Sequence, residues 1–304
     1  MKNMNPNRFR VIRDISIKEI KAAGIFISPL MILIFLFVLV PVLGTLINSL
    51  FQDVAFLGKR FVFLSNFRQL FGDSGFRQAL RFTLLFVLVS VPVEIILGLT
   101  FAVLMNAKVP LRGLLRACVL IPWAIPAAVS GRIWELIYNY SYGLANFVFI
   151  ELGITTEPIN WLGTSLGAFS AVVVADVWKT TPFVAIIMLA GLQAIPTELF
   201  SQAKVDRANF LQVFYKVTIP LIKPVIIVAV LFRTIDGLRV FDLIYVLTGG
   251  GPGGATTSIS HYAYRYFISG DFGYGSAVSV VLFVIAFLLS VFYVKVGRFE
   301  AERV

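Results

Sequence analysis

Six candidate functional residues are ionisable side chains inside long apolar stretches, where a charge is costly unless it faces a cavity or a partner. They are Glu94, Asp176, Lys179, Arg233, Asp236 and Arg239. Asp176 and Lys179 are three residues apart, so they can share a helix face and pair. A second ladder, at steps of three residues, runs from Arg233 to Asp242 and stays near one helix face.

Two interpretations of these charges remain open. They could line a path through a membrane and hydrogen-bond the hydroxyl groups of a cargo, or they could form internal salt bridges that help to pack the helices against a second subunit. Glu94 follows Pro92, and its carboxylate could contact cargo or cap the backbone groups that a kinked helix frees. We favour the structural role for Glu94.

The balance of these charges bears on the charge of the cargo. If the acids of the two ladders pair locally and Glu94 lies too far away, one arginine is left over, which suits an anionic cargo. A neutral cargo is the preferred alternative, since the four acids could match the three bases in an internal network.

The amino-acid composition indicates that the segments with these charges lie in a membrane. The 304 residues are 59% hydrophobic and 14% charged, with a mean hydropathy of +0.90. Soluble domains are about 45–50% apolar and about 25% charged, so a soluble enzyme and a disordered chain are both excluded. Cys118 is the single cysteine, so no intrachain disulfide forms, and we expect no metal site.

Six apolar stretches are long enough to cross a bilayer as helices, and they lack the two-residue alternation of barrel strands. We therefore predict an all-α membrane protein with six transmembrane helices. The predicted spans cover residues 24–47, 80–106, 114–137, 166–190, 219–247 and 276–296.

The positive charges indicate an orientation. Of the 26 Lys and Arg residues, 16 lie in the two tails, the second–third loop and the fourth–fifth loop, and 5 lie in the loops of the opposite side. This bias predicts that both termini lie on the cytoplasmic side of the cell (inner) membrane. It also explains the net charge of +10 without binding to nucleic acid. The predicted parts are a cytoplasmic tail (1–23), a six-helix domain (24–297) and a second cytoplasmic tail (298–304).

The loop 191–218 predicts a short helix on the cytoplasmic membrane face. Pro196, Thr197 and Glu198 resemble a helix start, with a hydroxyl cap and an acid in the first turn. Leu199, Ala203 and the later phenylalanines recur at helical spacing. Such a helix could lie passively at the interface or serve as a docking element.

The residues of this loop resemble a known signature. Pro196, Glu198, Leu199, Ala203, Asp206 and Ala208, followed by Phe214, Val217, Pro220, Leu221 and Pro224, match the cytoplasmic loop of the sugar-permease subunits of binding-protein-dependent ABC importers. The chain is most similar to the maltose and glycerol-phosphate type, in particular its first permease subunit. Three further segments (119–134, 176–196 and 241–267) match in the same order, and the resemblance covers about residues 25–297. It departs where the family has Glu, Ala and Gly and this chain has Ser201, Gln202 and Arg207.

The resemblance implies a type I ABC importer permease fold and a partner ATPase that seats on the loop. The implied docking residues are Glu198, Leu199, Ser201, Gln202, Ala203, Asp206, Arg207, Ala208 and Phe214. Arg207 removes the freedom that Gly gives to a bend, so either the bend is made differently or the helix continues.

The implied assembly has a second permease subunit, two ATPase subunits and an extracytoplasmic binding protein that delivers a carbohydrate. That cargo is a mono- or oligosaccharide, neutral or acidic, or a polyol phosphate. The ATPase subunits, not this chain, would bind ATP and Mg²⁺, so we expect neither cofactor nor catalytic residue here.

Two other functional classes fit the residues less well. ATP hydrolysis by this chain is disfavoured, because the glycines at 249–254 are not followed by the Lys of a phosphate loop. An intramembrane serine protease is disfavoured, because the sequence has no nucleophilic serine motif with which the single histidine, His261, could pair. The alternative that we keep is a stand-alone secondary transporter, although such proteins usually show more spans and an internal repeat.

Overall fold

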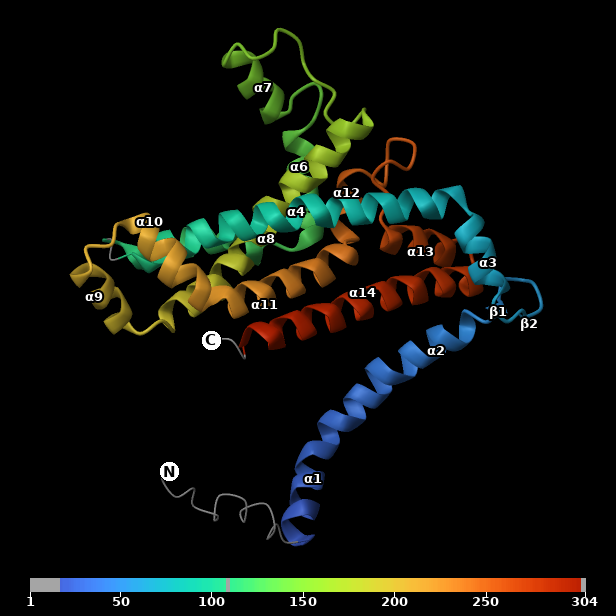
Figure 1. Cartoon of the computed structure of the whole chain (residues 1–304). Helices are drawn as coiled ribbons and strands as arrows, with labels where there is room; N and C mark the ends of the chain where they lie inside the picture. The colour runs from blue at the N-terminus through green and yellow to red at the C-terminus, as the bar shows by residue number, and fades with distance from the viewer. Residues whose placement is uncertain (1–16, 108–109, 302–304) are drawn as a thin grey trace.

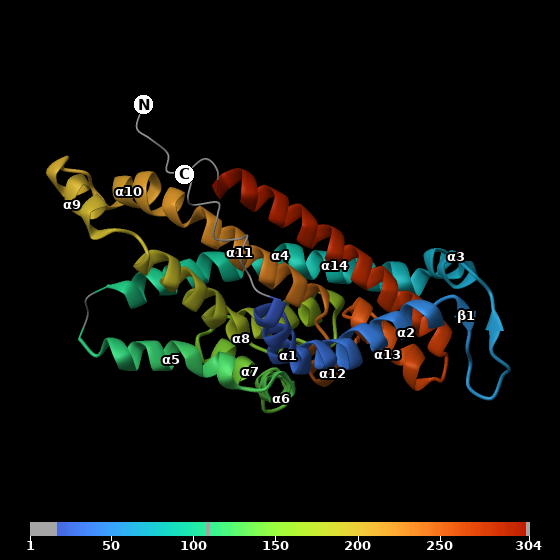
Figure 2. The ribbon, with the colours of Figure 1, turned by 90° about the horizontal axis from the view of Figure 1, so that it is seen from below.

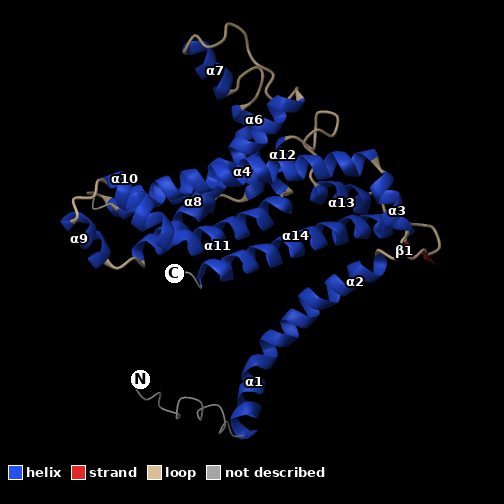
Figure 3. Ribbon diagram, in the orientation of Figure 1, coloured by secondary structure: helices blue, strands red, loops and turns tan. Residues whose placement is uncertain are grey.

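The computed structural model describes residues 17–107 and 110–301, and almost all of this part of the chain is helical (Figure 3). The helices are α1 (Ile17–Ile34), α2 (Val40–Asn48), α3 (Ser65–Gly72), α4 (Ser74–Asn106), α5 (Arg112–Ala124), α6 (Ala127–Ile137), α7 (Leu144–Glu151), α8 (Ser165–Gln193), α9 (Thr197–Val205), α10 (Phe210–Val213), α11 (Ile219–Leu238), α12 (Asp242–Leu247), α13 (Ile259–Ile268) and α14 (Phe272–Ala301). Two π-helical turns, η2 (Phe35–Leu39) and η3 (Phe214–Thr218), join α1 to α2 and α10 to α11. Strands β1 (Phe51–Gln52) and β2 (Arg60–Phe61) form an antiparallel hairpin.

Within the described residues, five helices are long and apolar enough to cross a membrane, and the bent pair α5–α6 makes a sixth if it is one span. The five cover Lys21–Asn48, Ser74–Asn106, Ser165–Gln193, Phe210–Leu238 and Phe272–Gly297. The all-α membrane fold predicted from the sequence is therefore confirmed. Helix α1 begins inside the predicted tail 1–23 and α14 extends into the tail 298–304, while residues 1–16 and 302–304 of these tails lie outside the described residues.

The third predicted span is not continuous. Helix α5 ends at Ala124 and α6 begins at Ala127, and the two helices meet at 93°. Pro126 stands directly before α6 in an extended conformation, where its missing N–H removes no helical hydrogen bond. The predicted span 114–137 is therefore two helices that meet at Pro126, and α6 leaves the bundle sideways and continues towards α7 (Figure 1).

The fifth predicted span also ends earlier than expected. The helical run from Phe210 stops at Leu238, and Val240 and Phe241 lie outside any helix before the short helix α12 starts at Asp242. The prediction of a single helix to residue 247 is therefore wrong. Consequently Arg239 and Asp242 do not continue the helical face that carries Arg233 and Asp236.

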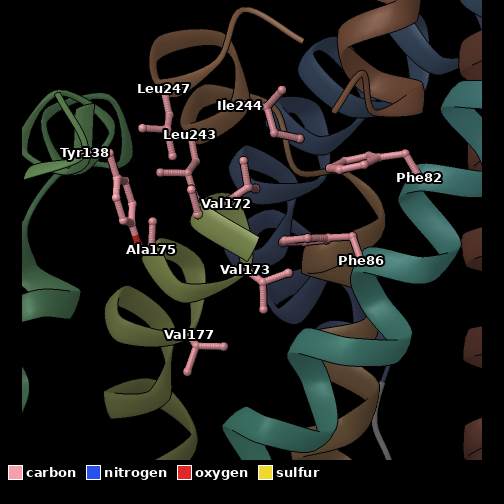
Figure 4. Packing of buried hydrophobic residues seen from close by; sticks show 11 residues of the cluster. Phe82, Phe86, Tyr138, Val172, Val173, Ala175, Val177, Leu243, Ile244 and Leu247 are labelled. Carbon is pink, nitrogen blue, oxygen red and sulfur yellow. The ribbon is translucent and has the colours of Figure 1, made fainter. Parts of the chain in front are cut away.

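The core is built on the close packing of α4 against α8. A Cβ atom at Gly98 of α4 would lie 2.5 Å from Val184 Cγ1 of α8, so this crossing requires glycine. Figure 4 shows the adjoining cluster, in which Phe82 and Phe86 of α4, Val172 of α8 and Ile244 of α12 pack together. The packed helices α4 and α8 carry three of the charged residues, namely Glu94, Asp176 and Lys179.

The N-terminal end of α4 is fixed to α13 and α14 by one carboxylate. Asp73 is the N-cap of α4, accepts a hydrogen bond from Gly75 N at 2.8 Å, and also accepts the hydroxyl protons of Tyr262 and Tyr274. Burial raises the pKa of the Asp73 carboxyl, but hydrogen bonding outweighs burial and holds this pKa below its ordinary value. The junction therefore prefers a charged Asp73.

The first span stands apart from the bundle. Helix α1 and the start of α2 run away from the other helices (Figure 1), and none of the most apolar part of this span is buried within the chain. A small cavity of about 180 Å³, lined by residues such as Leu46 and Phe283, lies between α2 and α14. The first span thus lies against the bundle near its C-terminal end, in α2.

Candidate translocation site and docking loop

Arg233 is the centre of a charge network that links three spans. Its guanidinium donates to Glu94 through Nε (2.5 Å) and Nη2 (3.0 Å), to Asp176 through Nη2 (2.9 Å), and to Asp236 through Nη1 (2.5 Å). Arg233 and Glu94 are 1% and 0% exposed, and Asp176 is also buried. Because α4, α8 and α11 each supply at least one member, the network fixes these spans to one another.

This arrangement contradicts three parts of the sequence interpretation. Asp176 pairs with Arg233 rather than with Lys179, whose ammonium donates to the carbonyl of Ile125 at 2.9 Å. Glu94 is not remote but binds Arg233 with both carboxylate oxygens. No arginine is therefore left without an acid in the network, and the argument for an anionic cargo loses its premise.

Thr180 is a member of the network that the sequence analysis missed. Its hydroxyl donates to Glu94 Oε1 at 2.9 Å and lies 2.7 Å from the carbonyl of Asp176, one helical turn earlier. A polar residue four positions after Asp176 shares its helix face, and this spacing was the available signal. Thr180 thereby orients the carboxylate that holds Arg233.

The end of the network at Asp236 and Arg239 is exposed. Asp236 has a half-exposed side chain that accepts from Arg233 at one oxygen and from Arg239 Nη2 at the other, at 3.3 Å. The Arg239 side chain is 70% exposed. The buried charges are therefore committed to one another, whereas Asp236 and Arg239 can exchange partners with water or a solute.

Two cavities of about 450 Å³ each open beside this exposed end. Both are lined by Trp123, Thr180, Asp236 and Arg239, and one of them also by Asp176, Lys179 and Asp242. Trp123 stacks on Phe183 with the ring centroids 5.9 Å apart, so it presents a fixed aromatic surface. An aromatic ring beside carboxylate and guanidinium groups can bind a polyhydroxylated molecule.

A larger cavity, of about 700 Å³, lies elsewhere. Its lining comes from α4, α5, α6 and α8 and is almost wholly apolar, with residues such as Leu97, Val119 and Val177. Such a lining offers few hydrogen bonds to a polar solute. The two polar cavities are therefore the better candidates for a translocation path.

The predicted docking loop folds as two short helices, α9 and α10. Glu198, Ser201, Gln202, Asp206 and Arg207 are exposed, whereas Leu199, Ala208 and Phe214 are half-buried. Ala203 is only 8% exposed, because α9 packs it against the chain itself. Helix α9 starts at Thr197 with Pro196 at the cap position, and the predicted Thr197 cap does not form.

Arg207 makes the bend between α9 and α10 in the backbone conformation that glycine favours. Its φ is +54°, and the next residue donates its N–H to the carbonyl of Ala203 at 2.9 Å. Asn209 then caps α10 in a reciprocal pair of hydrogen bonds with Gln212. The bend is thus kept without glycine, and the helix does not continue through Arg207.

The fold and this site define an integral membrane component of a transport system. Residues 94–298 match the family described as binding-protein-dependent transport system inner membrane component, and the chain belongs to this family. It is 50% identical over 286 residues to the trehalose/maltose transport system permease protein MalF of Thermococcus litoralis, covering 94% of this chain and 96% of the relative. It is 37% identical to the sulfoquinovosyl glycerol transport system permease protein SmoG of Agrobacterium fabrum, with 91% and 90% covered.

Solved structures of importers share the fold. A bacterial ABC transporter involved in the import of the acidic polysaccharide alginate superposes with a TM-score of 0.79 at 24% identity, covering 95% of this chain and 98% of that one. A chain of the MetNI methionine ABC transporter gives 0.54 at 20% identity, with 73% and 94% covered. The chain therefore has the type I ABC importer permease fold that the sequence indicated.

Proposed function

We propose that this chain is one of two permease subunits of a carbohydrate importer and that its cargo passes along the polar cavities beside Asp236 and Arg239. The observation that carries the proposal is the Arg233 network, which ends with one exposed carboxylate on the wall of both cavities. The 50% identical relative, named for trehalose and maltose, supports a sugar as cargo. Family membership also displaces the alternative of a stand-alone secondary transporter.

The charge distribution favours a neutral sugar. Arg233 already donates to three carboxylates, so it has little to offer an anion. Arg239 is exposed but has Asp236 beside it, which would repel a second carboxylate. Asp236 accepts hydrogen bonds and suits the hydroxyl groups of a mono- or oligosaccharide. An acidic sugar or a polyol phosphate is the less favoured cargo.

A partner ATPase would supply the energy by binding ATP and Mg²⁺ and seating on α9 and the turn that follows it. The accessible part of this loop includes the exposed residues Glu198, Ser201, Gln202, Val205, Asp206 and Arg207. Leu199, Ala203 and Phe214 instead hold the loop to the spans. Closure of two ATPase subunits would push the loop, and the linked spans would move with it.

The remaining partners follow from exposure and charge. The first span has an apolar surface that the rest of the chain leaves uncovered, so a second permease subunit would pack there. The distribution of Lys and Arg supports a cytoplasmic position for both termini. An external binding protein would deliver the sugar to the opposite face.

Reconstituted transport tests the proposal. Proteoliposomes that hold this chain, the second permease and the ATPase should accumulate maltose or trehalose only with ATP and the binding protein. Asp236→Asn should lower this uptake about tenfold or more, since hydrogen bonds to charged groups contribute about 1.5–3 kcal/mol. Glu135→Gln, which removes a carboxylate from an exposed ion pair with Arg132, is the matched control and should transport normally.

Two results would contradict the proposal. Uptake by this chain alone, driven by an ion gradient, would restore the secondary transporter. Preferential uptake of a uronate-containing sugar that Arg239→Gln abolishes, with neutral sugars unaffected by either variant, would replace the neutral cargo by an acidic one.

A further inference from the structure

A fully exposed aromatic side chain stands at the tip of the β1–β2 hairpin (residues 51–61). Phe56 is 107% exposed and has a φ of +67°, a backbone conformation that is unfavourable for a bulky residue. Its neighbour Leu57 is 64% exposed. The fold thus holds a large apolar side chain in a strained conformation without burying it, and such outliers concentrate at functional positions.

The tip is mounted rigidly. Ala55 N donates to the carbonyl of Gly270 at 2.7 Å, and Phe272 N donates to the carbonyl of Asp53 at 2.8 Å, so the turn between α13 and α14 holds the tip on both sides of Val54. On the other side of the tip, Lys59 Nζ forms an ion pair with Asp53 Oδ2 at 3.2 Å and donates a hydrogen bond to Asn48 Oδ1 at 2.7 Å. A rigid mount lowers the entropy cost of presenting Phe56 to a partner.

The position of the hairpin argues against lipid as that partner. In both Figure 1 and Figure 2 the hairpin extends beyond the ends of α4 and α14, in the direction in which these spans run. The tip therefore points into the aqueous phase on the side opposite the α9–α10 loop. Lys59 is paired with Asp53, so Arg60, which follows directly, gives the rim of the tip one net positive charge.

We propose that the tip of this hairpin is a docking point for the external binding protein, with Phe56 inserted into an apolar pocket that acidic residues flank. The inference rests on the proposed function, because it takes a binding-protein-dependent importer as given. A single aromatic anchor in a pocket is the usual form of an interface hot spot. The same contact would align the binding protein with the outer opening of the path.

Phe56→Gly separates the docking role from a folding role. Glycine removes the ring and relieves the positive φ, so the variant should fold at least as well as the wild type. In the reconstituted importer, the concentration of maltose- or trehalose-loaded binding protein that gives half-maximal ATPase stimulation should rise about tenfold or more. ATPase activity without binding protein should stay unchanged, and Phe56→Tyr should restore most of the affinity.

Leu111→Gly is the matched control, because Leu111 is also exposed (75%) with a positive φ (+57°) but precedes α5 at the other end of the spans. It should leave the response to binding protein unchanged. An unchanged half-maximal concentration in Phe56→Gly would overturn the docking proposal, whereas a wild type that never responds to binding protein would overturn the proposed function itself. A fluorophore on Phe56→Cys, in a background in which Cys118 is replaced by Ser, should shift to the blue only when binding protein is added. A shift in lipid alone would assign the tip to the bilayer.

Discussion

At the scale of single residues, Arg233 shows how a buried charge can be required without being a binding group. Its replacement by Met leaves Glu94 and Asp176 buried without a counter-charge, and breaking such a network costs about 3–5 kcal/mol. We expect Arg233→Met to lose thermal stability and assembly when it is followed by size-exclusion chromatography after heating. The triple variant that adds Glu94→Gln and Asp176→Asn should regain much of the loss.

Arg239→Met is the comparison for this experiment, since its exposed side chain contacts Asp236 at 3.3 Å. It should change stability by less than about 1 kcal/mol. Equal losses in Arg233→Met and Arg239→Met would mean that the buried network does not hold the spans together.

Arg207 gives a second prediction at this scale. A non-glycine residue at φ +54° is held at a cost of about 1–2 kcal/mol, so Arg207→Gly should raise the melting temperature of the purified complex. Lys204→Gly, in the last turn of helix α9, should lower it instead, because glycine is unfavourable in a helix and a basic side chain near the C-terminus is lost. A lower melting temperature in Arg207→Gly would indicate that the guanidinium makes a contact worth more than the backbone strain.

At the scale of elements, helix α9 separates exposed residues, which could contact the proposed ATPase, from residues that hold the helix in place. Val205 is 83% exposed and Ala203 is 8% exposed on the same helix. Val205→Asp should therefore abolish ATPase attachment with the melting temperature of the isolated permease unchanged, as measured by copurification and thermal unfolding. Ala203→Asp should destabilise the permease itself, because a carboxylate would be buried against the spans.

Retention of the ATPase by Val205→Asp, with normal turnover, would remove α9 from the docking surface. Loss of attachment in Ala203→Asp alone would carry no such meaning, since its own packing is disturbed.

The junction of α4, α13 and α14 should respond to acid. The pKa of Asp73 lies below its unfolded value, so the stabilisation that it gives is present above the unfolded pKa and is lost as the pH falls through the folded pKa. The wild type should thus lose melting temperature at acid pH more steeply than Asp73→Asn, which keeps a capping side chain without a titrating carboxylate. Parallel pH profiles for the two proteins would show that Asp73 does not set this dependence.

How far the sequence predicts these elements depends on what terminates each of them. The six apolar stretches are found by length and composition alone, since a bilayer fixes both. The break at Leu238 was missed because the apolar run beyond it, up to Leu247, was joined to the span, although Gly237, Arg239 and Asp242 mark the end of the helix. The pairing of Glu94 with Arg233 joins positions 139 residues apart and depends on the crossing of α4, α8 and α11, which periodicity within one helix does not encode.

At the scale of the whole molecule, the linked spans and the separate first span divide the chain into two mechanical parts. The Arg233 network and the glycine contact between α4 and α8 tie the centre of the bundle together. The docking loop joins α8 directly to the continuous helix from Phe210 to Leu238, both of which carry members of the network. A push on the loop would therefore reach the cavity walls through helices that move as a unit.

That mechanism requires the loop and the hairpin to lie on opposite sides of the membrane, and this orientation can be tested directly. Single cysteines at Gln202 and Lys204, in a background in which Cys118 is replaced by Ser, should react with membrane-permeant maleimides alone in sealed cells. Cysteines at Gly72 and Gly253 should also react with impermeant reagents. The reason is the excess of Lys and Arg on the side of the α9–α10 loop, which sets the orientation of short loops during insertion. Labelling of position 202 from outside intact cells would reverse the topology, and both the ATPase docking on α9 and the binding-protein contact at Phe56 would then be untenable.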